Sequence, residues 1–163
     1  RTQLWGHGLG CHMCLLRPRS RGEVTLNSSD PFEDPNIDPK FLSHPDDMRD
    51  MIAGYKQMMA ILNKESFSKY TSAHTMRPID ITNDDDIELA IREEADTVYH
   101  PVGTCKMGND EMAVVDKSLK VHGIKGLRIV DASIMPTLIG GNTNAPTIMI
   151  GEKAADMILD DWA

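Results

Sequence analysis

A histidine and an asparagine, in two segments set among short apolar runs and turn-forming glycines, are the residues of this chain best suited to chemistry. His100 is followed by Pro101, which biases the histidine away from the helical region and toward an extended conformation. Gly103 adds a point where the backbone can bend or approach another group closely. An imidazole held in such a segment is a candidate general base.

The second segment contains Asn142, Thr143 and Asn144, which follow a pair of glycines. Asn144 precedes Ala145 and Pro146, an arrangement typical of an N-cap with proline in the first helical turn. Asn142 and Thr143 are therefore predicted just ahead of a helix N-terminus, where backbone N–H groups favour negative charge. The pattern predicts a general base, a hydrogen-bonding amide and a helix end suited to an anion.

Each of these features also has a purely structural interpretation. A histidine before a proline can serve only to shape the backbone, and two asparagines before Ala-Pro can be no more than a helix cap. Spacing alone leaves both interpretations open.

Short apolar segments are expected to position the histidine and the asparagine. Residues 114–116 and 127–131 are apolar runs that end in a carboxylate, so they are predicted as short buried strands. Residues 97–99 are predicted to lead into a strand that carries His100. The closing helix is predicted over 146–162, with Asn144 as its cap, and His122 is predicted in a turn.

Upstream, the pattern predicts two strands and two further helices. The strands are expected at 14–16 and 23–26, around a bend rich in arginine. Residues 27–45 are dense in Asp, Pro, Asn and Ser and predict linked turns. Helices are predicted over 45–63 and from Asn83 or Asp84 to Glu94, and His44 is expected in a loop without a partner. The methionines of the first helix are expected to form a core face.

Composition narrows the possible partners. The formal net charge of −8 over 163 residues argues against a nucleic-acid partner. No apolar run approaches the ~20 residues that span a bilayer. The first residues are neither an initiator Met nor a signal peptide, so we expect a fragment whose own N-terminus is missing.

Three cysteines form no disulfide framework, which is consistent with a reducing compartment. We therefore expect a cytoplasmic protein, with membrane association through the missing N-terminus left open. Cys11 and Cys14, with His7 nearby, raise the alternative of a metal site. A zinc site would need a second ligand pair at suitable spacing, and none is present in the sequence, so we predict no metal site. Cys105 is expected to pack.

Several ordered segments resemble one known family. Residues 15–24, 29–32, 99–108, 130–136 and 141–156 closely resemble the C-terminal end of the glucose–methanol–choline family of FAD-dependent oxidoreductases. Within that family the chain is most similar to choline dehydrogenase and related alcohol dehydrogenases. The resemblance runs over nearly the whole chain, which makes it far more specific than a lone short motif.

The resemblance implies an α+β fold made of two partial domains. Residues 1–98 would form part of a substrate-binding domain, an antiparallel sheet with flanking helices. Residues 99–163 would carry the catalytic motifs and complete the FAD-binding α/β domain. The dinucleotide-binding glycine motif is absent from this sequence, so an N-terminal FAD-binding portion of the same protein is an expected partner.

The resemblance also implies a reaction and its residues. A primary alcohol, choline-like or other, would be oxidised to an aldehyde by proton abstraction and hydride transfer to FAD. His100 would be the general base, and Asn142, by counting back from Gly151, would be the second catalytic residue. Asn144 is left to capping. Contacts to FAD would come from Asp131, Ala132, Asn142 and Thr143.

The identity of the alcohol and the electron acceptor stay open, as does the choice between oxidase and dehydrogenase. Two alternatives also remain: a non-redox relative such as a hydroxynitrile lyase, which keeps the flavin without transferring a hydride, and an inactive truncated fragment.

Overall fold

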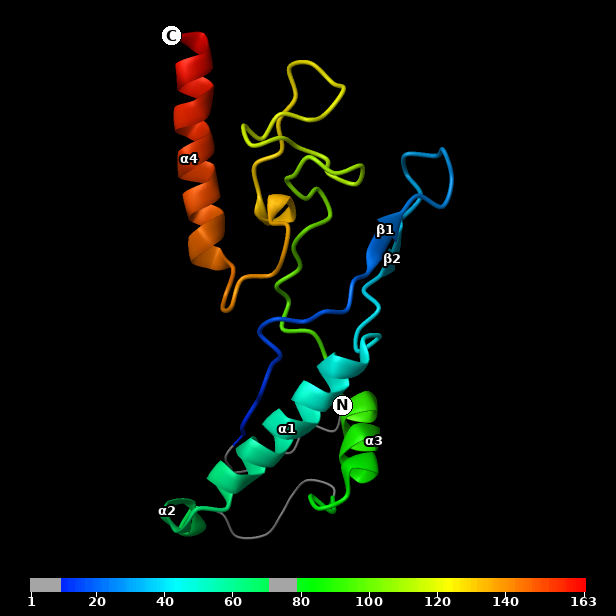
Figure 1. Cartoon of the computed structure of the whole chain (residues 1–163), viewed down its shortest axis with the longest axis vertical. Coiled ribbons are helices and arrows are strands. Elements are labelled where there is room, and N and C mark those ends of the chain that lie inside the picture. The colour runs from blue at the N-terminus through cyan, green and yellow to red at the C-terminus, as the bar shows by residue number, and fades with distance from the viewer. Residues whose placement is uncertain (1–9, 71–78) are drawn as a thin grey trace. The chain divides into compact units, whose positions relative to one another are not determined.

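The computed structural model describes residues 10–70 and 79–163, which divide into two compact units (Figure 1). Of the described residues, the first unit contains 10–15, 42–70 and 79–97, and the second contains 16–41 and 98–163. Residues 16–41 therefore group with the C-terminal part, whereas the predicted domains divided the chain once, after residue 98. Whether the two units correspond to substrate-binding and FAD-binding parts stays a prediction.

The first unit is helical. Its elements are α1 (Pro45–Leu62), α2 (Glu65–Ser68) and α3 (Asp84–Glu94). Both long helices begin with a side-chain cap: the backbone N–H of Asp46 donates to Nδ1 of His44 (3.2 Å), and that of Asp85 donates to Oδ1 of Asn83 (3.0 Å). The sequence indicated no partner for His44, and in the structure its ring fills the capping position.

The core of the first unit lies between α1 and α3. Met48, Ile87 and Ile91 are buried there, and the half-buried Met51 and Tyr55 pack around them. The predicted core face of the methionine-rich helix is confirmed. The strand predicted at 14–16 is wrong: this segment makes no sheet pairing, and the sulfur of Met13 lies against Gly54 of α1.

The second unit opens with a two-stranded antiparallel sheet of β1 (Glu23–Thr25) and β2 (Asn36–Asp38). Val24 pairs with Ile37 in its register. The strand β2 lies in the segment that was predicted as turns only. Its three residues, Asn-Ile-Asp, contain one apolar side chain and are too few to indicate a strand, so the pairing with β1 rather than the local pattern makes it a strand.

The remainder of the second unit contains the short 3₁₀ helix η1 (Ala132–Ile134) and the long helix α4 (Asn144–Trp162). The buried strands predicted at 114–116 and 127–131 are not formed, nor is the strand expected to carry His100. Isolated bridges occur in this part of the chain instead: Met107 with Val115, Val115 with Val121, and Lys120 with Arg128. His122 lies in a turn, as predicted.

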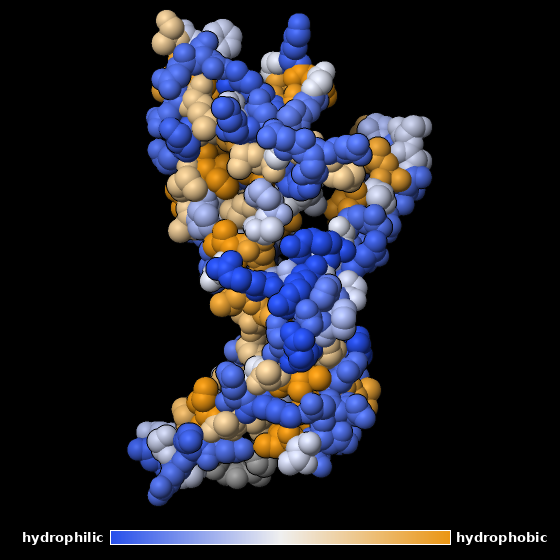
Figure 2. Space-filling view, viewed as in Figure 1, coloured by the Kyte–Doolittle hydropathy of each residue, from blue (hydrophilic) through white to orange (hydrophobic). Residues whose placement is uncertain are grey.

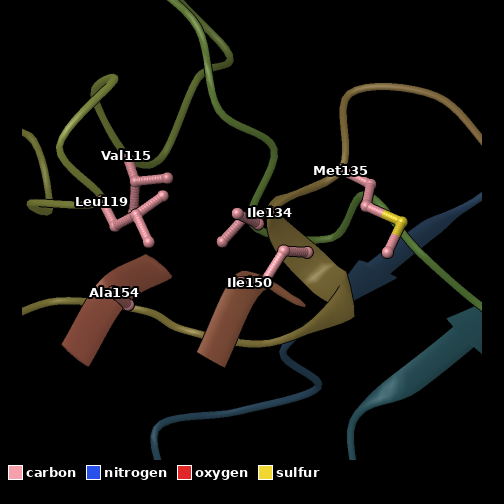
Figure 3. Close-up of a cluster of buried hydrophobic side chains, with 6 residues drawn as sticks. All are labelled: Val115, Leu119, Ile134, Met135, Ile150 and Ala154. Atoms are coloured by element: carbon pink, nitrogen blue, oxygen red, sulfur yellow. The ribbon is translucent and has the colours of Figure 1, made fainter. Parts of the chain in front are cut away.

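A single apolar cluster holds this unit together. Ile150 and Ala154 of α4 face Ile134 of η1 and Val115 and Leu119 of the bridged loops (Figure 3). Other apolar side chains of both units stay at the surface, beside hydrophilic ones (Figure 2). Among the described residues, no helix is long and apolar enough to cross a bilayer.

Candidate active site

His100 lies at the start of the segment that connects to η1. Its backbone is constrained on both sides, because Tyr99 adopts a positive φ of 60° and Pro101 follows. The segment then turns at Gly103, whose φ is +89°. A Cβ added at Gly103 would lie 3.2 Å from the carbonyl oxygen of Met135, so glycine allows a close approach to η1.

Backbone hydrogen bonds attach this segment to η1. The N–H of Cys105 donates to the carbonyl of Ser133 (3.0 Å), and the N–H of Met107 donates to that of Ile134 (2.8 Å). Cys105 is half-buried and is a free thiol. These bonds place the His100 segment against the same short helix that packs on α4.

The ring of His100 contacts the start of α4. Its Nδ1 lies 2.8 Å from Oγ1 of Thr143, a hydrogen bond that spans 43 residues of sequence. Among the described residues, Nε2 of His100 has no hydrogen-bond partner. The histidine is half-buried. One of its ring nitrogens is held by the protein, and the other is available.

The predicted cap of the closing helix is wrong. The N-cap position belongs to Thr143, and Asn144 is the first helical residue. No side chain caps this helix. The carbonyl of Thr143 instead accepts from both the backbone N–H (3.0 Å) and the hydroxyl (2.7 Å) of Thr147, so the first turn is closed by the helix itself.

Two asparagines flank Thr143, and both are exposed whereas Thr143 is buried. Neither Asn142 nor Asn144 makes a side-chain hydrogen bond to any described residue. Asn142 was preferred to Asn144 by counting back from Gly151, and Asn144 was expected to cap the helix. Since it does not, the amides of both residues lie free beside the hydroxyl that holds His100.

Asp131 and Ala132, the other predicted FAD contacts, lie at η1. The carboxylate of Asp131 caps η1 by accepting from the backbone N–H of Ser133 (2.7 Å). Asp131 is exposed, so part of its carboxylate stays open to solvent. The structure brings η1, α4 and the His100 segment into one unit, and it leaves the roles of these residues toward FAD as predictions.

The contact between Thr143 and His100 is the part of the site that sequence reasoning missed. Thr143 was predicted only as a contact to FAD. Nothing local to either residue indicates the pair, because they are far apart in sequence and a threonine before a helix is usually read as a cap.

One groove lies elsewhere, between α1 and α3. Its cationic residues are paired with neighbouring carboxylates: Arg49 with Asp46 (2.6 Å), Arg92 with Glu88 (2.7 Å), and Lys56 with Asp84. None of the predicted site residues lines it. Its charges are satisfied within the unit, so we do not assign it to the reaction. Among the described residues, no cluster of His, Cys, Asp and Glu could hold a metal ion.

Comparison with known proteins decides the family. The sequence model of the family described as GMC oxidoreductase matches residues 18–151. The chain belongs to the GMC oxidoreductase family. This confirms the resemblance seen in the motifs, and the homologues of this chain are FAD-dependent oxidoreductases, among them alcohol and choline dehydrogenases.

Relatives of this GMC oxidoreductase chain are similar over nearly its whole length. It is 50% identical over 154 residues to an alcohol dehydrogenase [acceptor] of Pseudomonas putida, covering 94% of this chain and 28% of that protein. It is 46% identical over 152 residues to an oxygen-dependent choline dehydrogenase of Cronobacter sakazakii, covering 93% and 27%. The chain thus spans little more than a quarter of the curated relatives.

Solved structures give the same result for the fold. A mutant formate oxidase from Aspergillus oryzae superposes with a TM-score of 0.85 at 35% identity, over 90% of this chain and 26% of that one. Pyridoxine 4-oxidase from Mesorbium loti gives 0.79 at 29% identity, over 86% and 28%. The arrangement of helices and the small antiparallel sheet is therefore that of a GMC oxidoreductase.

Proposed function

We propose that this chain is the C-terminal part of an FAD-dependent oxidoreductase that oxidises a primary alcohol to an aldehyde. The observation that carries the proposal is the state of His100. Its Nδ1 is bound at the first turn of α4, and its Nε2 has no partner in the described part of the chain. A half-buried imidazole with one nitrogen anchored and the other open has the arrangement required of a general base.

In this proposal His100 takes the hydroxyl proton of the alcohol at Nε2. The amide of Asn142 donates a hydrogen bond to the same oxygen as it becomes negative, and a donor placed in advance lowers the cost of that charge. Asn144 is a second candidate for this amide, because it is equally free. Bound FAD supplies the acceptor for the hydride.

The residues around the start of α4 fit the polar edge of a flavin. The backbone N–H groups of Asn144 and Ala145 have no partner among the described residues, and no side chain caps the helix. Free N–H groups at a helix start and neutral amides suit the acceptor oxygens and nitrogens of a flavin ring. Because the hydroxyl of Thr143 is used by His100, Thr143 would contact FAD through its backbone, next to Asp131 and Ala132 of the same unit.

The remainder of the FAD site would come from an N-terminal portion of the same protein. This proposal is supported by the length of the relatives and by a second apolar face on α4. Ile148, Leu159 and Trp162 recur at helical spacing and are 58%, 68% and 85% exposed. A helix that is apolar on two faces is normally covered on both. The first unit and the β1–β2 sheet would then belong to an antiparallel-sheet substrate domain, and α4 would complete the FAD-binding domain.

The alcohol itself is proposed by class only. Two of the relatives are named alcohol dehydrogenase and choline dehydrogenase, which supports a primary alcohol.

The test compares the rate of flavin reduction by an alcohol in the wild type and in His100→Ala, each prepared as the complete, FAD-loaded protein that includes the N-terminal portion. Loss of a general base should slow reduction by about 10²–10⁴-fold while flavin content stays normal. His122→Ala is the matched control, since His122 is an exposed histidine of the same unit that lies in a turn. Wild-type reduction rates in a folded, FAD-loaded His100→Ala protein would refute the role.

The same measurement separates an oxidoreductase from the two alternatives, a hydroxynitrile lyase and an inactive truncated fragment. An alcohol added without oxygen should bleach the flavin of an oxidoreductase, whereas a hydroxynitrile lyase would keep its flavin oxidised. An inactive fragment would hold no flavin at all.

A further inference from the structure

Thr143 occupies a capping position without capping. At the other two long helices, the N-cap residues His44 and Asn83 have extended backbones (ψ 129° and 113°), and their side chains accept from the backbone N–H of the second helical residue. Thr143 instead has φ −84° and ψ −8°, and its hydroxyl makes no bond to the helix backbone. A hydroxyl at this position normally stabilises the helix by about 1 kcal/mol, so its diversion indicates another role.

That hydroxyl is also buried. Thr143 is only 8% exposed, although Asn142 and Asn144 on either side are exposed. A buried hydroxyl needs a hydrogen-bond partner, and the partner among the described residues is Nδ1 of His100 at 2.8 Å. The carbonyl of Thr143 accepts in turn from the backbone N–H of Thr147 (3.0 Å), a bond that any residue other than proline at position 147 can make. The hydroxyl of Thr143 is therefore held in place, and its hydrogen bond orients the imidazole of His100.

We propose that Thr143 is the positioning residue of His100, accepting the Nδ1 proton so that Nε2 is the nitrogen that takes the proton of the substrate. The role given to Nε2 rests on the function proposed above. Neutral imidazole carries its proton on one nitrogen only, and the partner of one nitrogen sets the state of the other. A tautomer with the proton on Nε2 could not accept another there.

A hydroxyl suits this task because its oxygen carries lone pairs that can accept from Nδ1–H. It accepts from Nδ1–H while the base is neutral, and it keeps the same bond when the ring becomes an imidazolium and both nitrogens are donors. No group has to move at Nδ1 during proton transfer. Thr143 thus acts through His100 and need not contact the alcohol.

Three variants separate this role from a merely structural one. Thr143→Val keeps the shape and removes the hydroxyl, while Thr143→Ser keeps the hydroxyl. Thr147→Val is the matched control: it removes a neighbouring hydroxyl that bonds to Thr143 itself and makes no contact with His100. Each is prepared as the FAD-loaded protein labelled with ¹⁵N in histidine, and the His100 signals are assigned by comparison with His100→Gln.

The first readout is the protonation of the two ring nitrogens by long-range ¹H–¹⁵N correlation. We expect Nδ1–H in the wild type, in Thr143→Ser and in Thr147→Val, and a shift toward Nε2–H in Thr143→Val. The second readout is flavin reduction, which Thr143→Val should slow by about tenfold, the value of one hydrogen bond, with Thr143→Ser close to wild type.

A wild-type nitrogen pattern in Thr143→Val would overturn the inference, even if its rate fell. Nε2–H in the wild type would overturn it as well. Failure of the proposed function is a different result, namely normal flavin reduction in His100→Ala, and the tautomer measurement does not depend on it.

Discussion

At the scale of single residues, the site is a set of neighbours that share one anchor. His100 reaches across the sequence to Thr143, and Thr143 carries an exposed asparagine on either side. The side chain of Thr143 is buried and hydrogen-bonded, whereas those of Asn142 and Asn144 are exposed and bond to no described residue. The buried threonine orients the base, so the question left at this scale is which of the two amides meets the substrate oxygen.

Substitution of the two amides answers that question. Asn142→Ala and Asn144→Ala are each expected to leave helix α4 intact, because neither side chain bonds to it. The variant that loses the oxyanion donor should reduce flavin about 10²–10³-fold more slowly, and the other should stay near wild type. Flavin content, measured by absorbance, should be close to normal in both. Loss of flavin from either variant would mark that residue as a binding residue instead.

The contact between Thr143 and His100 also shows what a local pattern leaves undetermined. The polar segment before Ala145 was correctly predicted to precede a helix, since that signal is local. The identity of the cap was wrong because Thr143 takes a helical backbone conformation at the N-cap, and its hydroxyl meets a residue 43 positions away. His100 could be singled out from its neighbours, but its partner depends on tertiary packing.

At the scale of elements, the helices were predicted well, whereas of the predicted strands only the one at 23–26 is formed, as β1 (Glu23–Thr25). The helices observed at Pro45–Leu62 and Asp84–Glu94 match predictions within a residue, because apolar spacing and caps are local signals. The predicted strands at 114–116 and 127–131 became single bridges. There the apolar residues pack into the core beside α4 and do not pair with a neighbouring strand along their length. A buried loop and a buried strand therefore give the same apolar run in the sequence.

Gly103 is a position where both the backbone conformation and the space around it favour glycine. Gly103→Ala should destabilise the protein by about 1–3 kcal/mol, because a side chain at positive φ is strained and the new Cβ meets the carbonyl of Met135 at 3.2 Å. Gly123→Ala is a graded control, since it has φ +76° but open space around the added Cβ. Gly141→Ala, with neither feature, should be neutral. Urea unfolding measures all three, and equal effects at Gly103 and Gly141 would contradict the geometry.

An ion cluster ties the end of α4 to the bridged loops. Asp161 accepts from Lys120 (2.6 Å) and from Arg128 (2.5 Å), whose guanidinium also donates to the carbonyl of Ser118 (3.2 Å). The hydrogen bonds from Lys120 and Arg128 lower the pKa of Asp161 below its usual value. Because the folded-state pKa is the lower one, the cluster stabilises the fold above the unfolded-state pKa, and this stabilisation is lost as pH falls through the folded-state value.

Asp161→Asn should therefore reduce stability at neutral pH and leave stability at strongly acidic pH almost unchanged. Thermal unfolding at several pH values, with and without salt, measures this difference. The effect should shrink at high salt, since the cluster is partly exposed. Asp160→Asn is the control on the neighbouring exposed residue. A loss of stability that is the same at every pH would indicate that Asp161 acts by packing rather than by charge.

At the scale of the whole molecule, the chain is a part of a larger flavoprotein in our proposal, and α4 is where the two parts would meet. One face of α4 carries Ile150, Ala154 and Met157 and packs into the core of the second unit. The opposite face carries Ile148, Leu159 and Trp162, which are more than half exposed. A surface of this kind is typical of an interface that the rest of the protein covers.

The prediction at this scale concerns FAD itself. Purified alone, the chain should show no flavin absorbance and should take up little added FAD, because the glycine motif that binds the dinucleotide is absent from its sequence. Joined to the N-terminal portion of a GMC relative such as the alcohol dehydrogenase of Pseudomonas putida, it should yield a flavoprotein.

Leu159→Glu should lower the flavin content of that protein, since a charge would be buried where α4 is covered. Lys153→Glu also adds a negative charge to α4 but lies outside the apolar stripe, so flavin content should be unchanged. Equal flavin content in the two variants would show that this face of α4 stays in contact with water, and the apolar stripe would then need a different occupant.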